Sequence, residues 1–449
     1  MSVSFIILAA GMGSRMNSDT PKVLHHIAAA PLLHHALTAA RSLEPTRIVV
    51  VTGHESAAVA KSAEAFDPSV ECVLQDPQLG TAHAVDMAAP LLADSSGEAI
   101  VLYGDTPFIR PETLEAMLHA RARHSVVVLG FEAKDPGRYG RLVASGENLE
   151  KIVEYKEATD EERSITLCNS GVICASAKTL FELIAQVGNS NAAAEFYLTD
   201  IVEIARAQGL SAGVVTCDES ETLGVNTRAQ LAEAEAAFQS RARAEALENG
   251  VTLTAPETVF FALDTHIGRD AIIGPNVIFG PAVTIESGAE IKAFCHLEGC
   301  HVSRGATVGP FARLRPGAEL AEDVHVGNFV EIKNAILDEG VKVGHLTYIG
   351  DADIGEFTNI GAGTVTCNYD GVMKHRTKIG KRAFIGSDTM LVAPVSIGND
   401  ALTASGSVIT ENVPDEALAV GRSKQVNKPG LATKLMARLK AIKAAKGKS

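Results

Sequence analysis

The sequence predicts an α/β protein in three parts: a Rossmann-like domain over residues 1–226, a helical linker over 227–249 and a parallel β-helix over 250–449. In the first part, short apolar runs rich in β-branched residues alternate with helical stretches. The second part is rich in Ala, Glu and Arg, and in the third an aliphatic residue recurs at every sixth position.

The composition favours a globular protein that acts on small molecules. Its 449 residues are 46% hydrophobic, which suffices for two or three domain cores. A net charge of -14 argues against a general nucleic-acid binder. No apolar run reaches membrane-spanning length and no secretory signal is evident, so we expect a cytoplasmic protein without a membrane partner. The seven cysteines form no C-x-x-C motif and are expected to be buried thiols.

The first predicted strand, residues 3–8, leads into a loop suited to phosphate. Gly11 and Gly13 let backbone N–H groups approach a polyphosphate, and Arg15 and Lys22 add positive charge. The loop lacks the third glycine of the dinucleotide fingerprint G-x-G-x-x-G, and no Gly-Lys-Ser/Thr follows to make a P-loop. We therefore predict a nucleotide-phosphate loop of another kind. Further strands are expected in the runs that begin at Arg47, Cys72, Ala99, Ser125 and Ala212.

Asp105 follows one of these strands in YGDTP, at the edge where open α/β sheets bind ligands. Its carboxylate suits a metal ion, or it caps a helix that begins near Pro107 or Pro111; the residues alone leave both readings open. Asn226, in GVNTR, has an ordinary reading as a turn residue.

The linker is predicted to be one helix. Thr227 and Gln230 form a candidate capping box, and Asn249-Gly250 ends the pattern. Its apolar positions are sparse, which favours a partly exposed helix over a core helix; they are Leu231, Ala234, Phe238 and Leu247.

The six-residue repeat runs from Ile267 to Ile397, and a glycine commonly follows the aliphatic residue. Neither a helix nor a flat strand has this period, so we predict a parallel β-helix. The segment TCNYDGVMKHRT, between Val365 and Ile379, breaks the repeat and should loop out. Nearby, His345 suits a general base, although a lone histidine is more often structural. The basic tail from Leu431 is expected to be helical, either covering a phosphate of a ligand, which we favour, or lying free in solvent.

The segment from Leu8 to Leu24 resembles the signature of sugar-1-phosphate nucleotidyltransferases, L-A-A-G-x-G-[ST]-R-M followed by P-K. The repeat is similar to that of the hexapeptide acyltransferases, which are trimers of left-handed β-helices. Taken whole, the chain resembles the bacterial bifunctional N-acetylglucosamine-1-phosphate uridylyltransferases/glucosamine-1-phosphate N-acetyltransferases. That resemblance implies acetylation of glucosamine-1-phosphate by acetyl-CoA, then Mg²⁺-dependent uridylyl transfer from UTP. The product, UDP-N-acetylglucosamine, feeds peptidoglycan and lipopolysaccharide synthesis, and hence cell-wall biogenesis and cell shape.

The resemblance also implies the residues of the uridylyltransferase site. Arg15 and Lys22 would be catalytic, and Asp105 and Asn226 would hold Mg²⁺. The substrates would contact Leu8, Ala9, Ala10, Gly11, Lys22, Gln75, Gln78, Gly80, Thr81, Tyr103, Gly104, Asp105, Gly140, Glu154, Asn169 and Asn226. Without the resemblance, the stretch around Gln75 reads as a loop before a helix, and Glu154 as a solvated strand residue.

For acetyl transfer, the resemblance makes His345 the base. The sugar phosphate would contact Arg315, Lys333, Tyr348 and Asn359, and acetyl-CoA would contact Ala362, Asn368, Tyr369, Ser387, Ser405 and Arg422. On their own, Arg315 and Lys333 read as solvated charges. The chain departs from the family pattern at Ser14, at Ser405 and in a tail without Trp. Two other functions stay open: a nucleotidyltransferase whose β-helix is only an oligomerisation stem, and a scaffolding trimer without activity.

Overall fold

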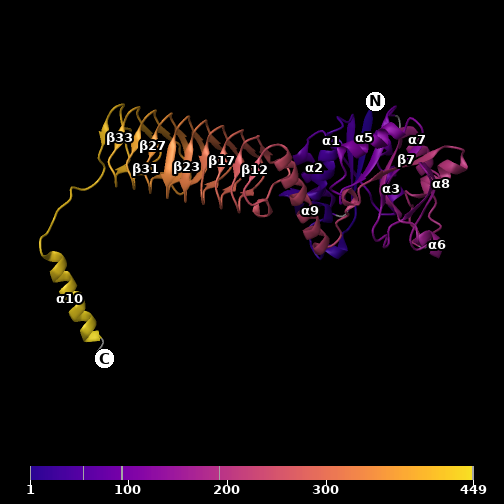
Figure 1. Ribbon diagram of the computed structural model, residues 1–449, viewed down its shortest axis with the longest axis horizontal. Coiled ribbons are helices and arrows are strands. Elements are labelled where there is room, and N and C mark those ends of the chain that lie inside the picture. Colours follow the sequence, from indigo (N-terminus) through magenta and orange to yellow (C-terminus); the bar gives the residue numbers. More distant parts are fainter. Residues whose placement is uncertain (1, 54, 93–94, 192, 447–449) are drawn as a thin grey trace. The chain divides into compact units, whose positions relative to one another are not determined.

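The computed structural model describes residues 2–53, 55–92, 95–191 and 193–446 (Figure 1). Its contacts divide the chain into two compact units. The first contains Met1–Asn249 together with Pro256–Thr265 and Phe279–Ala282, and the second contains the remainder. None of the helices described is long and apolar enough to cross a membrane.

The first unit is built on a mixed sheet with helices on both faces. Strand β1 pairs in parallel with β4 and β6, and β7 pairs in parallel with β11, while β10 runs antiparallel between β6 and β7. In spatial order the described strands are β5 (Glu71–Leu74), β4 (Arg47–Thr52), β1 (Val3–Ala9), β6 (Glu98–Tyr103), β10 (Leu167–Ser176), β7 (Val126–Glu132), β11 (Ala212–Cys217), β9 (Asn148–Val153) and β8 (Arg141–Ser145). The predicted α/β architecture is confirmed.

Two apolar layers make the core of this sheet, one on each face. One layer includes Leu33, Leu37 and Met117, and the other includes Leu180 and Ile201, all fully buried. Their helices cover the strands because apolar side chains recur on one side of each helix. The helices are α1 (Leu32–Arg41), α2 (Ser56–Phe66), α3 (Thr81–Asp86), α4 (Ala89–Leu92), α5 (Pro111–Ala120), α6 (Asp160–Arg163), α7 (Ala177–Ile184) and α8 (Asp200–Ala207), with the 3-10 turns η1 (Ser14–Met16), η2 (Lys22–Leu24) and η3 (Glu219–Thr222). A small hairpin joins β2 (His26–Ile27) to β3 (Ala30–Pro31).

The linker helix is α9 (Arg228–Glu248). The Thr227 hydroxyl accepts a hydrogen bond from the Gln230 N–H at 3.2 Å, as predicted. The reciprocal half of the capping box is wrong, because the Gln230 side chain accepts instead from the N–H of Asn226, at 2.9 Å. Most of the helix is exposed, and its buried residues include Phe238 and Gln239.

Gln239 ties α9 to the segment Pro256–Thr265, which includes the turn η4 (Pro256–Thr258). Its side-chain amide donates to the carbonyl of Phe261 and accepts from the N–H of Phe261, both at 2.8 Å. These bonds satisfy a buried peptide group, which is costly to leave unpaired. The segment therefore belongs with the first unit although it follows the first strand of the β-helix.

The second unit is the predicted parallel β-helix, whose stacked coils are visible in Figure 1. Along one sheet, buried side chains lie directly above one another in successive coils. These inward side chains are Ile273, Ile291, Val308, Val326, Val343, Ile360 and Ile385. The six-residue period is confirmed because each flat face of a coil contributes one such residue.

The strands of the β-helix are short. One sheet contains β12 (Thr252–Leu253), β14 (Ile272–Ile273), β17 (Glu290–Ile291), β20 (Thr307–Val308), β23 (His325–Asn328), β25 (Lys342–His345), β27 (Asn359–Ile360), β30 (Phe384–Ile385), β33 (Leu402–Thr403) and β35 (Leu418–Ala419). The other sheet contains β13 (His266–Ile267), β15 (Ile278–Phe279), β16 (Val283–Ile285), β18 (His296–Leu297), β19 (Cys300–Val302), β21 (Arg313–Leu314), β22 (Ala318–Leu320), β24 (Glu331–Leu337), β26 (Tyr348–Ile354), β28 (Val365–Cys367), β29 (Thr377–Ile379), β31 (Met390–Val392), β32 (Val395–Ile397) and β34 (Val408–Ile409).

One corner of the β-helix carries exposed aromatic side chains in a column. Phe294, Phe311 and Phe329 have backbone φ of 61°, 57° and 56°. Their rings stack, with centroids 4.8 Å apart for the first pair and 5.3 Å for the second. We call these three residues the phenylalanine column. Each ring is about half exposed, so a continuous apolar strip faces outward.

The predicted break in the repeat is confirmed with narrower bounds. Thr366 and Cys367 still belong to β28 and Thr377 already belongs to β29, so the excursion comprises residues 368–376. The tail forms helix α10 (Leu431–Lys446), as expected, and its side chains are exposed. Coverage of a ligand phosphate by the tail stays a prediction.

Candidate active sites

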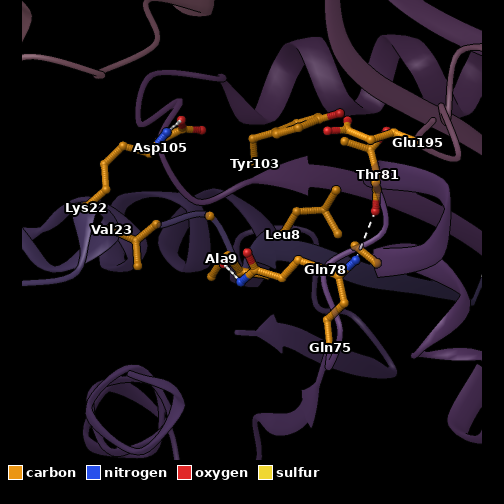
Figure 2. A pocket seen from close by; sticks show the side chains of 14 residues that line it. Leu8, Ala9, Lys22, Val23, Gln75, Gln78, Thr81, Tyr103, Asp105 and Glu195 are labelled. Carbon is orange, nitrogen blue, oxygen red and sulfur yellow. Dashed lines mark hydrogen bonds and ion pairs between the residues drawn. The ribbon is translucent and has the colours of Figure 1, made fainter. Parts of the chain in front are cut away.

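A cleft of about 370 Å³ lies where β1 and β6 end (Figure 2). These strands are parallel neighbours, so their carboxyl ends share one edge of the sheet. Of the predicted nucleotide residues, the cleft is lined by Leu8, Ala9, Ala10, Gly11, Lys22, Gln75, Gln78, Gly80, Thr81, Tyr103 and Asp105. Val23, Ala84 and Glu195 also line it and were not predicted. Gly104 is buried beside it and donates its N–H to the carbonyl of Leu8 at 3.0 Å.

Gly11 and Gly13 are suited to the loop for different structural reasons. Gly13 has φ of 63°, and a Cβ there would lie 2.6 Å from the Cβ of Lys22, so this glycine lets the chain fold back against the lysine. An added Cβ on Gly11 would meet nothing within 4 Å. Gly11 therefore leaves open space on the side of the cleft, where backbone N–H groups could meet a phosphate.

Lys22 forms an ion pair with Asp105, towards which it extends in Figure 2. Its ammonium also donates to the side-chain oxygen of Asn226 at 3.1 Å, and the guanidinium of Arg15 donates to the same oxygen at 2.8 Å. The four predicted catalytic and metal-binding side chains thus meet at one place. Asp105 does not cap a helix: α5 is preceded by Arg110 and has no side-chain cap.

The Asp105 and Asn226 oxygens both lie within reach of a single atom, the Lys22 nitrogen. Carboxylate and amide oxygens are ligands that suit Mg²⁺. The donor set and its convergence therefore fit the expected magnesium ion.

The two glutamines are already engaged with the protein. The Gln75 amide donates to the carbonyl of Gly80 at 2.9 Å, and the Gln78 amide donates to the carbonyl of Ala10. The Thr81 hydroxyl accepts from the N–H of Leu198 at 2.9 Å. The amide N–H groups of Gln75 and Gln78 hold the rim of the cleft together. Their side-chain oxygens remain available to accept hydrogen bonds from the nucleobase of a nucleotide.

A second cavity of about 560 Å³ adjoins the cleft and shares Thr81, Tyr103 and Glu195 with it. Glu154 and Asn169 line this cavity, as predicted for a sugar site. Gly140 lies beside both, since a Cβ there would be 3.6 Å from each side chain. Burial raises the pKa of the Glu154 carboxyl, and the Thr199 hydroxyl donates to it at 3.4 Å.

Sequence reasoning missed several residues of this cavity: Arg138, Tyr155, Lys156, Glu157, Tyr197 and Thr199. The first four flank predicted positions in RYGR and IVEYKEA, so their proximity in the chain was a usable signal. Tyr197 and Thr199 come from the loop before α8, and nothing in their local sequence pointed to a sugar.

On the β-helix, His345 lies at a corner and is exposed. Its Nδ1 is 2.6 Å from the side-chain oxygen of Asn328, which pairs with it in the coil before. Because the amide oxygen only accepts, Nδ1–H donates, which assigns the lone pair to Nε2. The histidine is thereby held in the tautomer that a general base at Nε2 requires.

The same corner position recurs in each coil. The carbonyls of Asn328, His345, Ala362 and Ser387 each accept a backbone N–H from the next coil. The N···O distance is 3.1 Å for the Asn328 carbonyl and 2.7 Å for the Ala362 carbonyl. The guanidinium of Arg422 donates to the carbonyl of Ser405, the next member. We call Asn328, His345, Ala362, Ser387 and Ser405 the histidine column. It aligns the predicted base with three of the six predicted acetyl-CoA residues, Ala362, Ser387 and Ser405.

A basic cluster lies on the adjoining face, formed by Arg315, Lys333 and Lys374 with Tyr348. Arg315 pairs with Glu331 at 2.8 Å, while its Nε is buried without a partner among the described residues. Lys374 was not predicted. The neighbouring ammonium of Lys333 lowers its pKa, which places two like charges side by side. Such a pair is stabilised by a phosphate dianion.

Three predicted residues are placed differently. Asn359 lies on the other sheet from Lys333, in β27, beside Lys342 and Phe384. Asn368 is buried and donates to the carboxylate of Asp351. The Tyr369 hydroxyl donates to the carbonyl of Gly371 at 2.6 Å, and its ring is exposed on the excursion. One chain therefore does not bring Asn359 into contact with the basic cluster.

These two sites, on these two folds, define a nucleotidyltransferase joined to a hexapeptide-repeat transferase. Residues 5–186 match the MobA-like NTP transferase domain, and residues 264–299 match the bacterial transferase hexapeptide (six repeats). Among solved structures, the inositol-1-phosphate CTP transferase from T. maritima aligns with 52% of this chain and 94% of its own, at 18% identity and a TM-score of 0.43.

Full-length relatives specify the family. The bifunctional protein GlmU of Cereibacter sphaeroides (strain ATCC 17023) is 76% identical over 100% of this chain and 98% of its own, and that of Paracoccus denitrificans is 67% identical over 98% of both. The chain belongs to the GlmU family. This membership confirms the predicted class, a bifunctional uridylyltransferase and acetyltransferase of UDP-N-acetylglucosamine synthesis.

Proposed function

We propose that residues 1–226 carry uridylyl transfer, that 227–249 connect, and that 250–449 carry acetyl transfer. The observation that carries the first assignment is the meeting of Arg15, Lys22, Asp105 and Asn226 beside the glycine loop. UTP occupies the cleft, and N-acetylglucosamine-1-phosphate occupies the adjoining cavity with Glu154, Asn169 and Gly140 around the sugar. The two cavities share Thr81 and Tyr103, which supports the binding of the two substrates next to each other.

In the first site the sugar phosphate oxygen attacks the α-phosphorus of UTP and pyrophosphate leaves. The protein has to neutralise several negative charges and hold attacker and leaving group in line. Arg15 and Lys22 supply the positive charge at the glycine loop. Asp105 and Asn226 would hold Mg²⁺, which supplies further neutralisation of the phosphates. No protein nucleophile is needed.

In the second site Nε2 of His345 takes the proton from the ammonium of glucosamine-1-phosphate, so that the amine can attack the thioester of acetyl-CoA. Asn328 holds the imidazole by its Nδ1–H. Arg315, Lys333 and Lys374 bind the sugar phosphate, with Tyr348 beside them. Ala362, Ser387, Ser405 and Arg422 line the path of CoA along the corner, and Tyr369 contributes from the excursion, while the buried Asn368 holds the start of the excursion through its bond to Asp351.

We further propose that the chain acts as a homotrimer in the cytoplasm. The exposed phenylalanine column supports association, because contiguous apolar strips of this kind mark interfaces. Asn359 and the basic cluster lie on different sheets, which suits a site completed by a neighbouring subunit. All seven cysteines are free, as is usual in a reducing compartment.

The direct test is a mass spectrum of the products formed from glucosamine-1-phosphate, acetyl-CoA, UTP and Mg²⁺. We expect UDP-N-acetylglucosamine, free CoA and pyrophosphate. His345→Ala should abolish CoA release and leave uridylyl transfer to added N-acetylglucosamine-1-phosphate unchanged. The matched control is His301→Ala, since His301 is another partly exposed histidine of the β-helix, paired with Glu286 at 2.9 Å. If CoA release survives in His345→Ala, the assigned base is wrong; if wild type releases no CoA, the β-helix is only a stem.

A further inference from the structure

The ammonium of Lys22 contacts both oxygens of the proposed metal site, those of Asp105 and Asn226. It pairs with Asp105 and donates to Asn226 at 3.1 Å. The Lys22 and Asp105 side chains are only 14% and 17% exposed, so water screens this ion pair less than a surface pair. One protein cation thus neutralises the carboxylate.

The backbone around Lys22 keeps the ammonium there. Pro21 precedes the short turn η2, in which the N–H of Leu24 donates to the carbonyl of Pro21 at 2.9 Å. Gly13 lies directly against the Cβ of Lys22 and leaves no room for a side chain between them. The first carbons of the lysine side chain are therefore held against the glycine loop.

We infer that Lys22 is an internal counter-ion that excludes a divalent cation from Asp105 and Asn226 until nucleotide phosphates arrive. Metal binding at these two oxygens would require the Lys22 ammonium to give up its contacts with Asp105 and Asn226, and would leave two like charges close together. When phosphate oxygens enter the cleft, Lys22 has another acceptor, and the two oxygens become available. This inference rests on the proposed uridylyltransferase site.

Arg15 has a lesser part in this exclusion. It is exposed, and among the described residues its guanidinium donates to Asn226, at 2.8 Å, and not to the carboxylate of Asp105. The side-chain oxygen of Asn226 accepts from both cations. By linkage, if bound metal raises the affinity for the nucleotide by some factor, bound nucleotide raises the affinity for the metal by the same factor. Lys22 is accordingly a positioning residue for metal entry as well as a phosphate ligand.

The test measures Mn²⁺ binding to the full chain without nucleotide, by the loss of the electron paramagnetic resonance signal of free Mn²⁺. Wild type should bind Mn²⁺ weakly, and Lys22→Met should lower Kd for Mn²⁺ at least tenfold. Lys22→Arg retains a cation and should stay close to wild type. Arg15→Met is the matched control, because it removes a neighbouring cation that does not pair with Asp105; its Kd should change less than threefold. Circular dichroism checks that each variant is folded.

A double variant separates this inference from the proposed function. Asp105→Asn added to Lys22→Met should return Mn²⁺ binding to the weak level. If Lys22→Met binds Mn²⁺ no tighter than wild type, the counter-ion inference is overturned, whether or not the enzyme forms UDP-N-acetylglucosamine. If Lys22→Met gains a tight site that Asp105→Asn leaves intact, the gained site is elsewhere and the inference also fails. If the proposed function itself is wrong, the wild-type enzyme will release no pyrophosphate from UTP and N-acetylglucosamine-1-phosphate.

Discussion

Replacing Arg141 with methionine should loosen the sugar side of the uridylyltransferase site. Arg141 is 2% exposed. Its guanidinium donates to four backbone carbonyls, those of Pro136, Gly137, Tyr139 and Arg163. The guanidinium therefore clamps the turn that leads into Gly140, whose carbonyl accepts the N–H of Asn169 at 2.9 Å.

The magnitude follows from these bonds. A hydrogen bond from a charged donor contributes about 1.5–3 kcal/mol. Gly137 and Tyr139 are exposed, so their carbonyls regain water when the turn opens, and only part of the sum is lost. We expect the free energy of local opening to fall by about 2–4 kcal/mol, which is about 30- to 900-fold in the opening equilibrium. Arg141→Lys keeps the charge but makes fewer hydrogen bonds, so its free energy of local opening should lie between those of wild type and Arg141→Met.

Amide hydrogen exchange measures this opening directly. The N–H groups of Tyr139 and Asn169 should lose protection by the stated factor, and KM for N-acetylglucosamine-1-phosphate should rise about tenfold with a smaller change for UTP. Arg123→Met is the control, because Arg123 is an exposed arginine of the same unit that pairs with Glu147 at 3.0 Å. Unchanged protection at both amides in Arg141→Met, together with an unchanged KM, would refute the clamp.

Three other perturbations test separate parts of the structure. Gly80 has φ of 119° and a Cβ there would lie 2.5 Å from the carbonyl of Phe196, so Gly80→Ala should raise KM for UTP more than tenfold while CoA release is unchanged; equal loss of both activities would contradict this local effect. Burial, and then the charge of Glu157, raise the pKa of Asp200 to about 6, so its ionisation opposes folding and stability falls as pH rises from about 4 to 6. Asp200→Asn should therefore raise the free energy of unfolding, measured by urea titration, by about 1 kcal/mol at pH 7.5 after solvent screening, and leave it unchanged at pH 4; a gain at pH 4 alone would refute the sign. Phe311→Ser removes the middle ring of the phenylalanine column and should shift sedimentation from the proposed trimer towards the monomer, and an unshifted sedimentation coefficient would contradict an interface at this column.

Local patterns predicted much of the architecture from the sequence. Three features depend only on residues close together in the chain: the run at residues 3–8, the loop after it and the six-residue period. A local sequence pattern is therefore enough to predict each of them. Strand β10 was not predicted, because Gly171, at φ of 90°, lies in an irregular stretch between Asn169 and Ile173 that interrupts the apolar pattern. The second half of the capping box is absent because the Gln230 side chain accepts from the N–H of Asn226 instead of that of Thr227.

The missed site residues share one cause. Tyr197, Thr199 and Lys374 reach their sites through chain segments whose local pattern specifies nothing about what lies opposite. Thr199 becomes informative only when the fold brings its hydroxyl to Glu154, and Lys374 only when the excursion returns beside Lys333. Such contacts join elements far apart in sequence, so no window on the chain contains them.

The histidine column shows why a regular repeat can hide a catalytic position. The β-helix requires an inward aliphatic residue on each face and tolerates almost any side chain at an outward corner. Asn328, His345, Ala362 and Ser387 differ in side chain, yet the carbonyl of each accepts a backbone N–H from the next coil, and the carbonyl of Ser405 accepts from the Arg422 guanidinium instead. A histidine at that corner therefore breaks no rule of the repeat, and its neighbour one coil earlier supplies the acceptor that sets its tautomer. The repeat period determines where the proposed base lies, while the side chains above and below it, which the period does not constrain, determine what chemistry it can perform.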